Sequence, residues 1–103
     1  MREILPDIET WLAAGEEVAV ATLVQATGSS PRPLGSKLAI SSGGAMSGSV
    51  SGGCVEGAVF EEAQEVLRTG VPKRLHYGIS DETAWSVGLT CGGEIDVVVE
   101  KLD

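Results

Sequence analysis

The segment that decides the fold is AMSGSVSGGCVEGAVFEEAQEVLRTG, residues Ala45–Gly70. Its first seven residues predict a strand, which ends at the glycine pair Gly52 and Gly53. Its second part places apolar residues at helical spacing from about Cys54 to Thr69 and then ends on a glycine, a common helix stop. The segment therefore predicts a strand that passes through a glycine turn directly into an amphipathic helix.

Outside this segment the same periodicities predict one more main helix, four more strands and one short helical piece. The helix spans residues 4–14, the strands span 18–24, 37–41, 73–77 and 94–101, and the short piece spans 80–87. No linker interrupts them, so residues 1–103 form one domain. We predict an α+β fold with one mixed sheet of about five strands and two main helices packed against it, in a strand order that the pattern does not fix.

Composition limits the function. The chain has a formal net charge of -8, which argues against binding to nucleic acid or to an anionic membrane surface. No apolar run approaches the roughly 20 residues that span a bilayer, and charges interrupt the N-terminus where a signal peptide would be apolar. We expect a cytoplasmic protein whose thiols are reduced, with a disulfide as the less favoured alternative.

The two cysteines are the most informative residues, because Cys54 and Cys91 each stand beside a Gly-Gly pair. Glycines let a ligand approach the backbone closely, and the first N–H groups of a helix attract anions. Cys54 at a helix start would favour the thiolate form, and Ser51 could add a hydroxyl. The alternative is structural: two tight turns, each with a small buried residue beside it.

Other site chemistries fit less well. Neither the P-loop spacing nor the Gly-x-Gly-x-x-Gly spacing of dinucleotide-binding proteins occurs in the glycine-rich segments. A zinc site made of Cys54, Cys91 and His76 would lack a fourth ligand, so we predict no metal site. The alternating pattern around His76 predicts a histidine on the surface of a strand. The proline-containing loop Thr27–Lys37 carries Arg32 and Lys37, which could hold an anionic group or simply be solvated.

Four segments in this order resemble the N-terminal domain of the XdhC/CoxI family. They are Ala21–Lys37, Gly48–Glu56, Tyr77–Asp81 and Val87–Ile95, and the resemblance extends over nearly the whole chain. Typical members continue into a Rossmann-like domain that is absent here. The resemblance therefore leaves open whether this is a single-domain member or a truncated one.

The resemblance implies a maturation factor for molybdenum hydroxylases such as xanthine dehydrogenase and carbon monoxide dehydrogenase. Such a protein would bind the molybdenum cofactor (molybdopterin) transiently while its sulfur is installed. Its partners would be the apo-hydroxylase, a cofactor-sulfurating enzyme, a separate Rossmann-domain chain and other copies of itself. The residues assigned to the cofactor are Ser51, Gly52, Gly53, Cys54, Cys91, Gly92, Gly93, Arg32 and Lys37.

Two other functions remain open from the residues alone. The cysteines could act as a redox pair in a sulfur carrier or oxidoreductase, which would make the protein an enzyme rather than a chaperone. Alternatively, the domain could recognise the apo-hydroxylase without holding cofactor.

Overall fold

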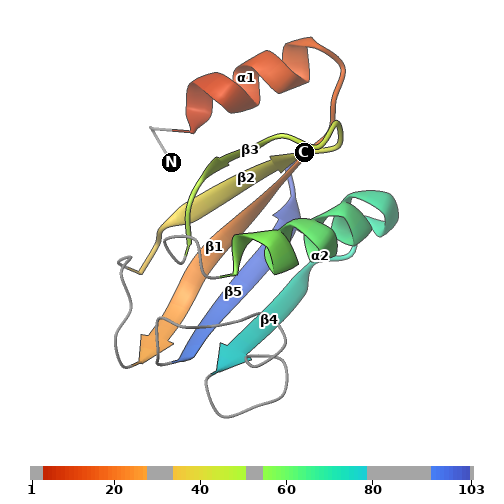
Figure 1. Ribbon diagram of the computed structural model, residues 1–103. Coiled ribbons are helices and arrows are strands. Elements are labelled where there is room, and N and C mark those ends of the chain that lie inside the picture. The colour runs from red at the N-terminus through yellow and green to blue at the C-terminus, as the bar shows by residue number, and fades with distance from the viewer. Residues whose placement is uncertain (1–3, 28–33, 51–54, 79–93, 103) are drawn as a thin grey trace.

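The computed structural model describes residues 4–27, 34–50, 55–78 and 94–102, which contain two helices and five strands. In chain order these are α1 (Leu5–Ala13), β1 (Val18–Thr27), β2 (Lys37–Ser41), β3 (Met46–Gly48), α2 (Glu56–Thr69), β4 (Lys73–Gly78) and β5 (Glu94–Lys101). The short helical piece expected at residues 80–87 lies outside the described residues. Figure 1 shows the sheet between the two helices.

The strands form one sheet in the order β3-β2-β1-β5-β4, and the predicted α+β class, strand number and two packed helices are confirmed. All four described pairings are antiparallel, although a mixed sheet was expected. The reason is the position of β5, which the sequence pattern could not give. The last strand inserts between β1 and β4 and runs opposite to both, so no neighbouring strands are parallel.

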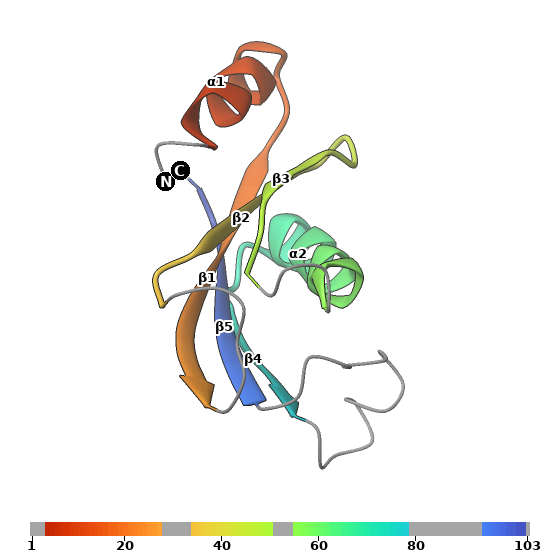
Figure 2. The same cartoon turned by 60° about the vertical axis from the view of Figure 1, so that its left-hand side comes forward.

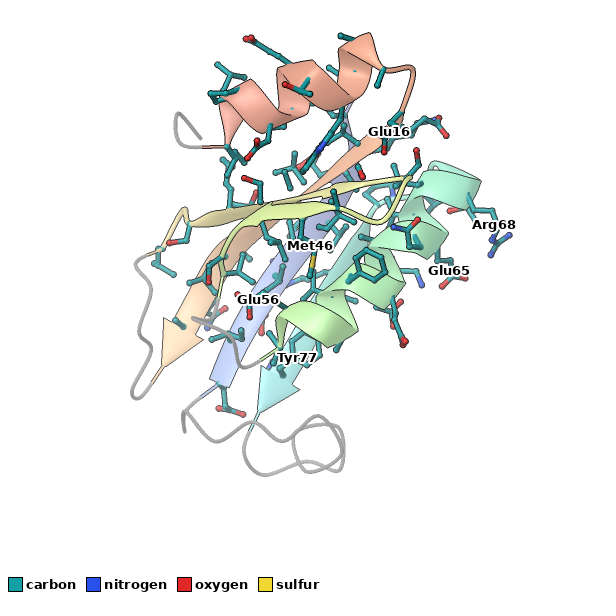
Figure 3. The ribbon with its side chains drawn as sticks, turned by 45° about the horizontal axis from the view of Figure 1, so that its top comes forward. Glu16, Met46, Glu56, Glu65, Arg68 and Tyr77 are labelled. Carbon is teal, nitrogen blue, oxygen red and sulfur yellow. The ribbon has the colours of Figure 1, made fainter. Side chains whose placement is uncertain are left out.

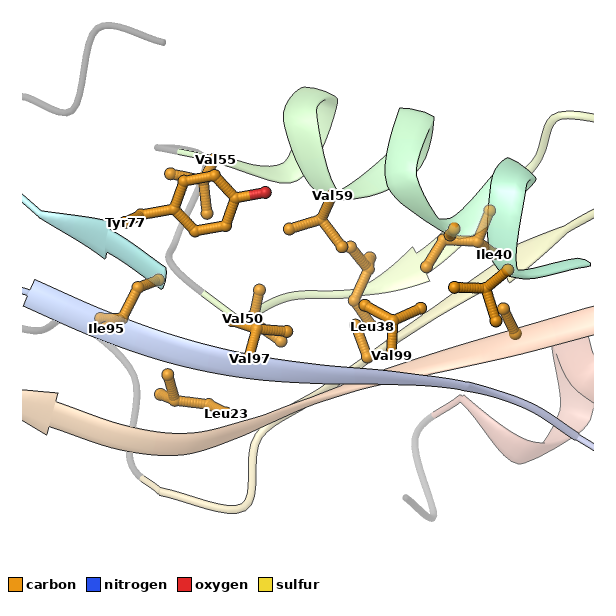
Figure 4. Packing of buried hydrophobic residues seen from close by; sticks show 14 of the residues in the cluster. Leu23, Leu38, Ile40, Val50, Val55, Val59, Tyr77, Ile95, Val97 and Val99 are labelled. Carbon is orange, nitrogen blue, oxygen red and sulfur yellow. The ribbon is translucent and has the colours of Figure 1, made fainter. Parts of the chain in front are cut away.

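The main core lies between the sheet and α2 (Figure 4). As the helical periodicity predicts, α2 buries one stripe, and the facing strands supply alternate residues. The fully or almost fully buried members include Ala21, Leu23, Leu38, Ile40, Val50, Val55, Val59, Ala63, Val66, Val97 and Val99. Ser41 is also buried and is hydrogen-bonded, because its carbonyl accepts from Gln64 Nε2 of α2 at 3.0 Å. This hydrogen bond joins the helix to the sheet.

Strand β1 continues past residue 24, the expected end of the strand, and it contains a β-bulge. The pairing with β5 shifts between Leu23 and Gln25, so the intervening Val24 has no partner in the register. Leu23 and Ala26 consequently both pack toward the core although three positions separate them. Val24 is exposed, as expected for a bulged residue. The bulge therefore lets β1 continue past Val24 with Ala26 on the core side of the sheet.

Helix α1 covers one end of the opposite sheet face (Figure 2). Ile4 and Ile8 are buried there against residues of β1 and β2, namely Val18, Val20 and Ala39, with Trp11 partly buried beside them. The apolar spacing of the helix predicted over residues 4–14 would place Leu5 and Leu12 on its buried side, but both are exposed. The correction has a simple cause, since the helix touches the sheet along a single line and residues one position off that line face solvent.

The strand expected at residues 45–51 is shorter in the structure, where β3 spans only Met46–Gly48. The predicted turn at residues 42–44 does join β2 to β3 as an antiparallel hairpin. Gly48 then takes φ +95°, and the chain leaves the ladder so that Val50 enters the core on the α2 side. Gly48 is therefore the residue at which the chain leaves β3 and turns toward α2.

Candidate functional site

Two of the segments that carry predicted site residues adjoin the same end of the sheet. Thr27, the last residue of β1, and Gly78, the last residue of β4, both pair with Glu94, the first residue of β5. Segments 28–33 and 79–93 therefore depart from one end of the sheet, although their own placement lies outside the described residues. The described residues that flank the two segments in sequence, Thr27, Gly78 and Glu94, therefore lie at the same end of the sheet.

The third segment, residues 51–54, joins β3 to α2 in the sequence. Gly48, the last residue of β3, pairs with Leu38, which in turn pairs with Ala21 of β1, and the described chain resumes at Val55. Val50 is 0% exposed and Val55 is 1% exposed, and both belong to the main core. Figure 4 shows Val55 beside the ring of Tyr77 from β4. The core therefore holds the residues on both sides of segment 51–54, Val50 and Val55.

Glu56, labelled in Figure 3, forms a polar clamp on the residues that precede segment 51–54. Its Oε2 accepts a hydrogen bond from Ser49 Oγ at 2.7 Å and another from the Val50 backbone N–H at 3.0 Å. Glu56 is the first residue of α2, where a carboxylate is also stabilised by the helix dipole. The half-buried Glu56 side chain thus connects Ser49 and Val50, just before segment 51–54, to the first turn of α2.

Most of the sequence-predicted site residues lie outside the described residues. These are Ser51, Gly52, Gly53, Cys54, Cys91, Gly92, Gly93 and Arg32. The structure accordingly gives the positions of the residues that flank them, and their assignment to a cofactor stays a prediction. The helix that follows Cys54 begins at an N-cap residue, Val55, whose aliphatic side chain makes no capping hydrogen bond.

Lys37 is the predicted site residue that the structure describes, and it lies away from the start of α2. Its neighbours in β2 alternate, with Leu38 and Ile40 in the core beneath α2 and Ala39 on the α1 side. Lys37 shares the face of Ala39, and its Nζ donates to Thr22 Oγ1 at 3.0 Å. The Lys37 ammonium therefore lies on the sheet face opposite α2.

His76 lies on the sheet surface, as predicted, within a cluster of charged residues. Its Nδ1 is 2.6 Å from Asp96 Oδ1, and its Nε2 is 3.5 Å from Glu94 Oε1. Asp96 Oδ2 also accepts from Arg74 Nε and Nη2, at 3.1 and 2.9 Å. The hydrogen bond from His76 and, next, that from Arg74 hold the pKa of Asp96 below its ordinary value, against partial burial, which raises it.

The lowered pKa predicts how Asp96 affects stability. A carboxyl with a lower pKa in the folded state stabilises the protein above its unfolded pKa, about 3.9, and this stability is lost as pH falls through the folded value. Asp96→Asn should therefore lower the unfolding free energy at pH 7 by about 0.5–1 kcal/mol, allowing for solvent screening of exposed partners. Urea denaturation between pH 7 and pH 2 should show this difference shrinking below about pH 4.

The matched control for this experiment is Glu9→Gln, which neutralises an exposed carboxyl on α1. Its unfolding free energy should stay within about 0.5 kcal/mol of the wild type across the range. If Asp96→Asn tracks this control at every pH, the Asp96 cluster does not stabilise the fold.

A resident metal centre is not supported by the described part of the chain, in which no three His, Cys, Asp or Glu side chains gather closely enough to hold an ion. Within those residues, no helix is long and apolar enough to cross a membrane.

Sequence reasoning did not single out Glu56 as a site residue. The available signal was its position, because an acidic residue in the first helical turn, shortly after a glycine-rich strand end, can reach back to the preceding backbone. Asp96 was missed too, since its partners Arg74 and His76 become neighbours only through the β4–β5 pairing.

Comparison with known protein families gives a match to the model described as the XdhC and CoxI family over residues 11–78. The chain is 37% identical over 92 residues to the molybdenum cofactor insertion chaperone PaoD of Escherichia coli, covering 88% of this chain and 28% of that protein. It is 31% identical over 99 residues to a protein of Bacillus subtilis named as a probable xanthine dehydrogenase subunit, covering 92% of this chain and 29% of the relative.

A solved crystal structure described as a xanthine dehydrogenase from Bacillus halodurans has the same fold. It superposes with a TM-score of 0.79 and 31% sequence identity, over 96% of this chain and 30% of that one. The chain thus spans less than a third of the length of each of these relatives.

Proposed function

Because the chain belongs to the XdhC and CoxI family, we propose that it is the cofactor-binding domain of a molybdenum cofactor chaperone. In this proposal the domain binds the cofactor transiently, in the cytoplasm, and takes part in its insertion into an enzyme of the xanthine dehydrogenase or carbon monoxide dehydrogenase type. The names of two relatives, an insertion chaperone and a xanthine dehydrogenase subunit, support this direction. Its partners would be the apo-enzyme, the enzyme that sulfurates the cofactor, a separate Rossmann-domain chain and further copies of itself.

The observation that carries the proposal is that β1 and β4 end, and β5 begins, at one end of the sheet. The segments that adjoin this end and the start of α2 in sequence contain two glycine pairs, two thiols and an arginine. Backbone N–H groups and a guanidinium suit the phosphate of the cofactor, and soft sulfur ligands suit its metal. The residues that this chain would place around such a group therefore fit its chemistry.

We assign the roles from this fit. Gly52, Gly53, Gly92 and Gly93 would present backbone N–H groups, and Ser51 would add a hydroxyl. Cys54 and Cys91 would hold the sulfur-bearing end of the cofactor, and Arg32 would hold its phosphate. When bound, the cofactor supplies the molybdenum chemistry of the target enzyme, and this domain supplies binding and orientation. Glu56 would orient the turn that carries Cys54.

Cofactor retention tests the proposal directly. Purified protein is mixed with isolated molybdenum cofactor and desalted, and the retained molybdenum and pterin are then measured. Cys54→Ser and Cys91→Ser should each reduce retention at least about tenfold, the loss expected for one strong contact to a charged ligand. Glu9→Gln, on α1 and away from the end of the sheet at which β5 begins, should retain cofactor like the wild type.

Two outcomes would redirect the assignment. If both cysteine variants retain the cofactor fully, the thiols do not hold it. If the wild type retains none but captures the apo-hydroxylase, the domain is a recognition module instead.

A further inference from the structure

A second polar site lies on the sheet face that α2 does not cover. Here a cavity of about 190 Å³ is lined by three strands, β1, β2 and β5, and by the residue after β5. Its lining residues are Val20, Thr22, Lys37, Glu100, Lys101 and Leu102. This volume corresponds to roughly six water-sized groups, at about 30 Å³ each, which is enough for a small organic molecule.

Lys37 is exceptional among the cations in the described part of the chain. Arg68, Lys73, Arg74 and Lys101 each lie within 4.0 Å of a carboxylate. Lys37 is half-buried, and the partner of its Nζ is the neutral hydroxyl of Thr22. Carboxylates are abundant in a chain of net charge -8, yet none of the described ones pairs with the Lys37 ammonium. This favours an anion from outside the protein as its partner.

The geometry of the Thr22 hydroxyl strengthens this interpretation. Its oxygen accepts from Lys37 Nζ, so its own proton can point to another acceptor. Lys37 keeps further N–H donors as well, since an ammonium carries three. Both side chains come from paired positions of neighbouring strands, which hold them side by side on one face. The cavity therefore offers a convergent pair of donors, one of them charged.

The other lining groups restrict which anion fits. Val20 and Leu102 provide an apolar wall, and both belong to or pack against the core under α1. Glu100 adds a negative charge to the cavity, while Lys101 is paired with Glu17 at 2.5 Å. A doubly charged ligand such as phosphate is therefore repelled more strongly by Glu100 than a singly charged one. The apolar wall favours a ligand that also carries a short hydrocarbon chain.

From these observations we propose that the Lys37–Thr22 cavity binds a small monocarboxylate with a short apolar chain. The carboxylate accepts from Lys37 Nζ and the Thr22 hydroxyl, and the chain contacts Val20 and Leu102. This site goes beyond the proposed cofactor function and lies on the opposite side of the sheet from the start of α2.

Sodium butyrate is a suitable probe because its carboxylate and short alkyl chain match the donors and the apolar wall of the cavity. Amide resonances of Thr22, Lys37 and Leu102 should shift saturably when butyrate is titrated into the ¹⁵N-labelled protein. Lys37→Met and Thr22→Val should raise the dissociation constant, the former at least about tenfold, and Lys37→Arg should restore most of the affinity. Lys73→Met removes an ion-paired lysine elsewhere and should leave butyrate binding unchanged.

Ligand controls separate charge from size. 1-Butanol at equal concentration and sodium chloride at equal ionic strength should produce no saturable shift at these residues. The proposal is overturned if Lys37→Met binds butyrate like the wild type, if butanol binds equally well, or if inorganic phosphate binds more tightly than butyrate. Cofactor retention by Thr22→Val should equal that of the wild type, so failure of this site and failure of the cofactor proposal give different results.

Discussion

Gly48→Ala should lower the unfolding free energy by about 2–5 kcal/mol, a large share of the stability of a domain this size. Gly48 has φ +95°, which costs an L-residue about 1–2 kcal/mol. An added Cβ would lie 2.3 Å from the carbonyl oxygen of Lys37 and 2.8 Å from Ile4 Cγ2. Overpacking of this kind typically costs about 1–3 kcal/mol more. Urea denaturation followed by far-UV circular dichroism measures the change.

The Lys37 carbonyl cannot move away cheaply, because it accepts a hydrogen bond from the Ser49 N–H at 3.0 Å. The strain should therefore affect both the end of β3 and the approach to α2. Gly57→Ala is the matched control. Gly57 is helical, and its added Cβ would meet no atom within 4 Å, so this variant should gain about 0.5–1 kcal/mol. Equal effects of the two substitutions would show that the contact at Gly48 is not tight.

The parts of the fold that sequence could predict are those controlled by local periodicity. The stripe of α2 and the alternation in β4 were readable because each follows from one helix or strand repeating its own spacing. The bounds of β2 and β5 agree with the prediction for the same reason. Gly70 was readable as the end of α2, and its φ of +75° confirms the left-handed cap.

The rest depends on pairings between distant residues. Nothing local in β5 indicates that it inserts beside β1, and that insertion alone makes the sheet fully antiparallel. The same holds for Lys37, whose face was fixed only when Leu38 and Ile40 were seen in the core under α2. In the sequence Lys37 is a basic residue at the end of a proline-containing loop. In the fold its ammonium lies on the sheet face opposite α2.

Glu56→Ala is the second substitution for which we expect a large effect, and it tests how the glycine turn is held. The substitution removes the acceptor of two hydrogen bonds, from the Ser49 hydroxyl and the Val50 N–H. Val50 is fully buried, so its N–H would be left without this carboxylate close to the core. Losing hydrogen bonds to a charged acceptor costs about 1.5–3 kcal/mol each, and partial exposure of the site reduces the sum to about 2 kcal/mol.

Glu61→Ala is the matched control, since Glu61 is an exposed residue of the same helix and the chemical change is identical. It should change the unfolding free energy by no more than about 0.5 kcal/mol. Glu56→Gln keeps an acceptor oxygen but no charge and should fall between the two. A double-mutant cycle with Ser49→Ala should give a coupling energy of at least about 0.5 kcal/mol, because both partners of one hydrogen bond are then removed together.

The functional consequence follows from what the clamp connects. Val50 and Val55, on either side of segment 51–54, pack in the main core, and Glu56 also binds the Val50 N–H to the first turn of α2. If Cys54 holds the cofactor, a looser turn should reduce retention in proportion to the stability lost locally, and Glu56→Ala should retain roughly tenfold less cofactor than Glu61→Ala. Retention that is equal in the two variants, with a stability difference of about 2 kcal/mol, would make the clamp structural and remove Glu56 from the cofactor site.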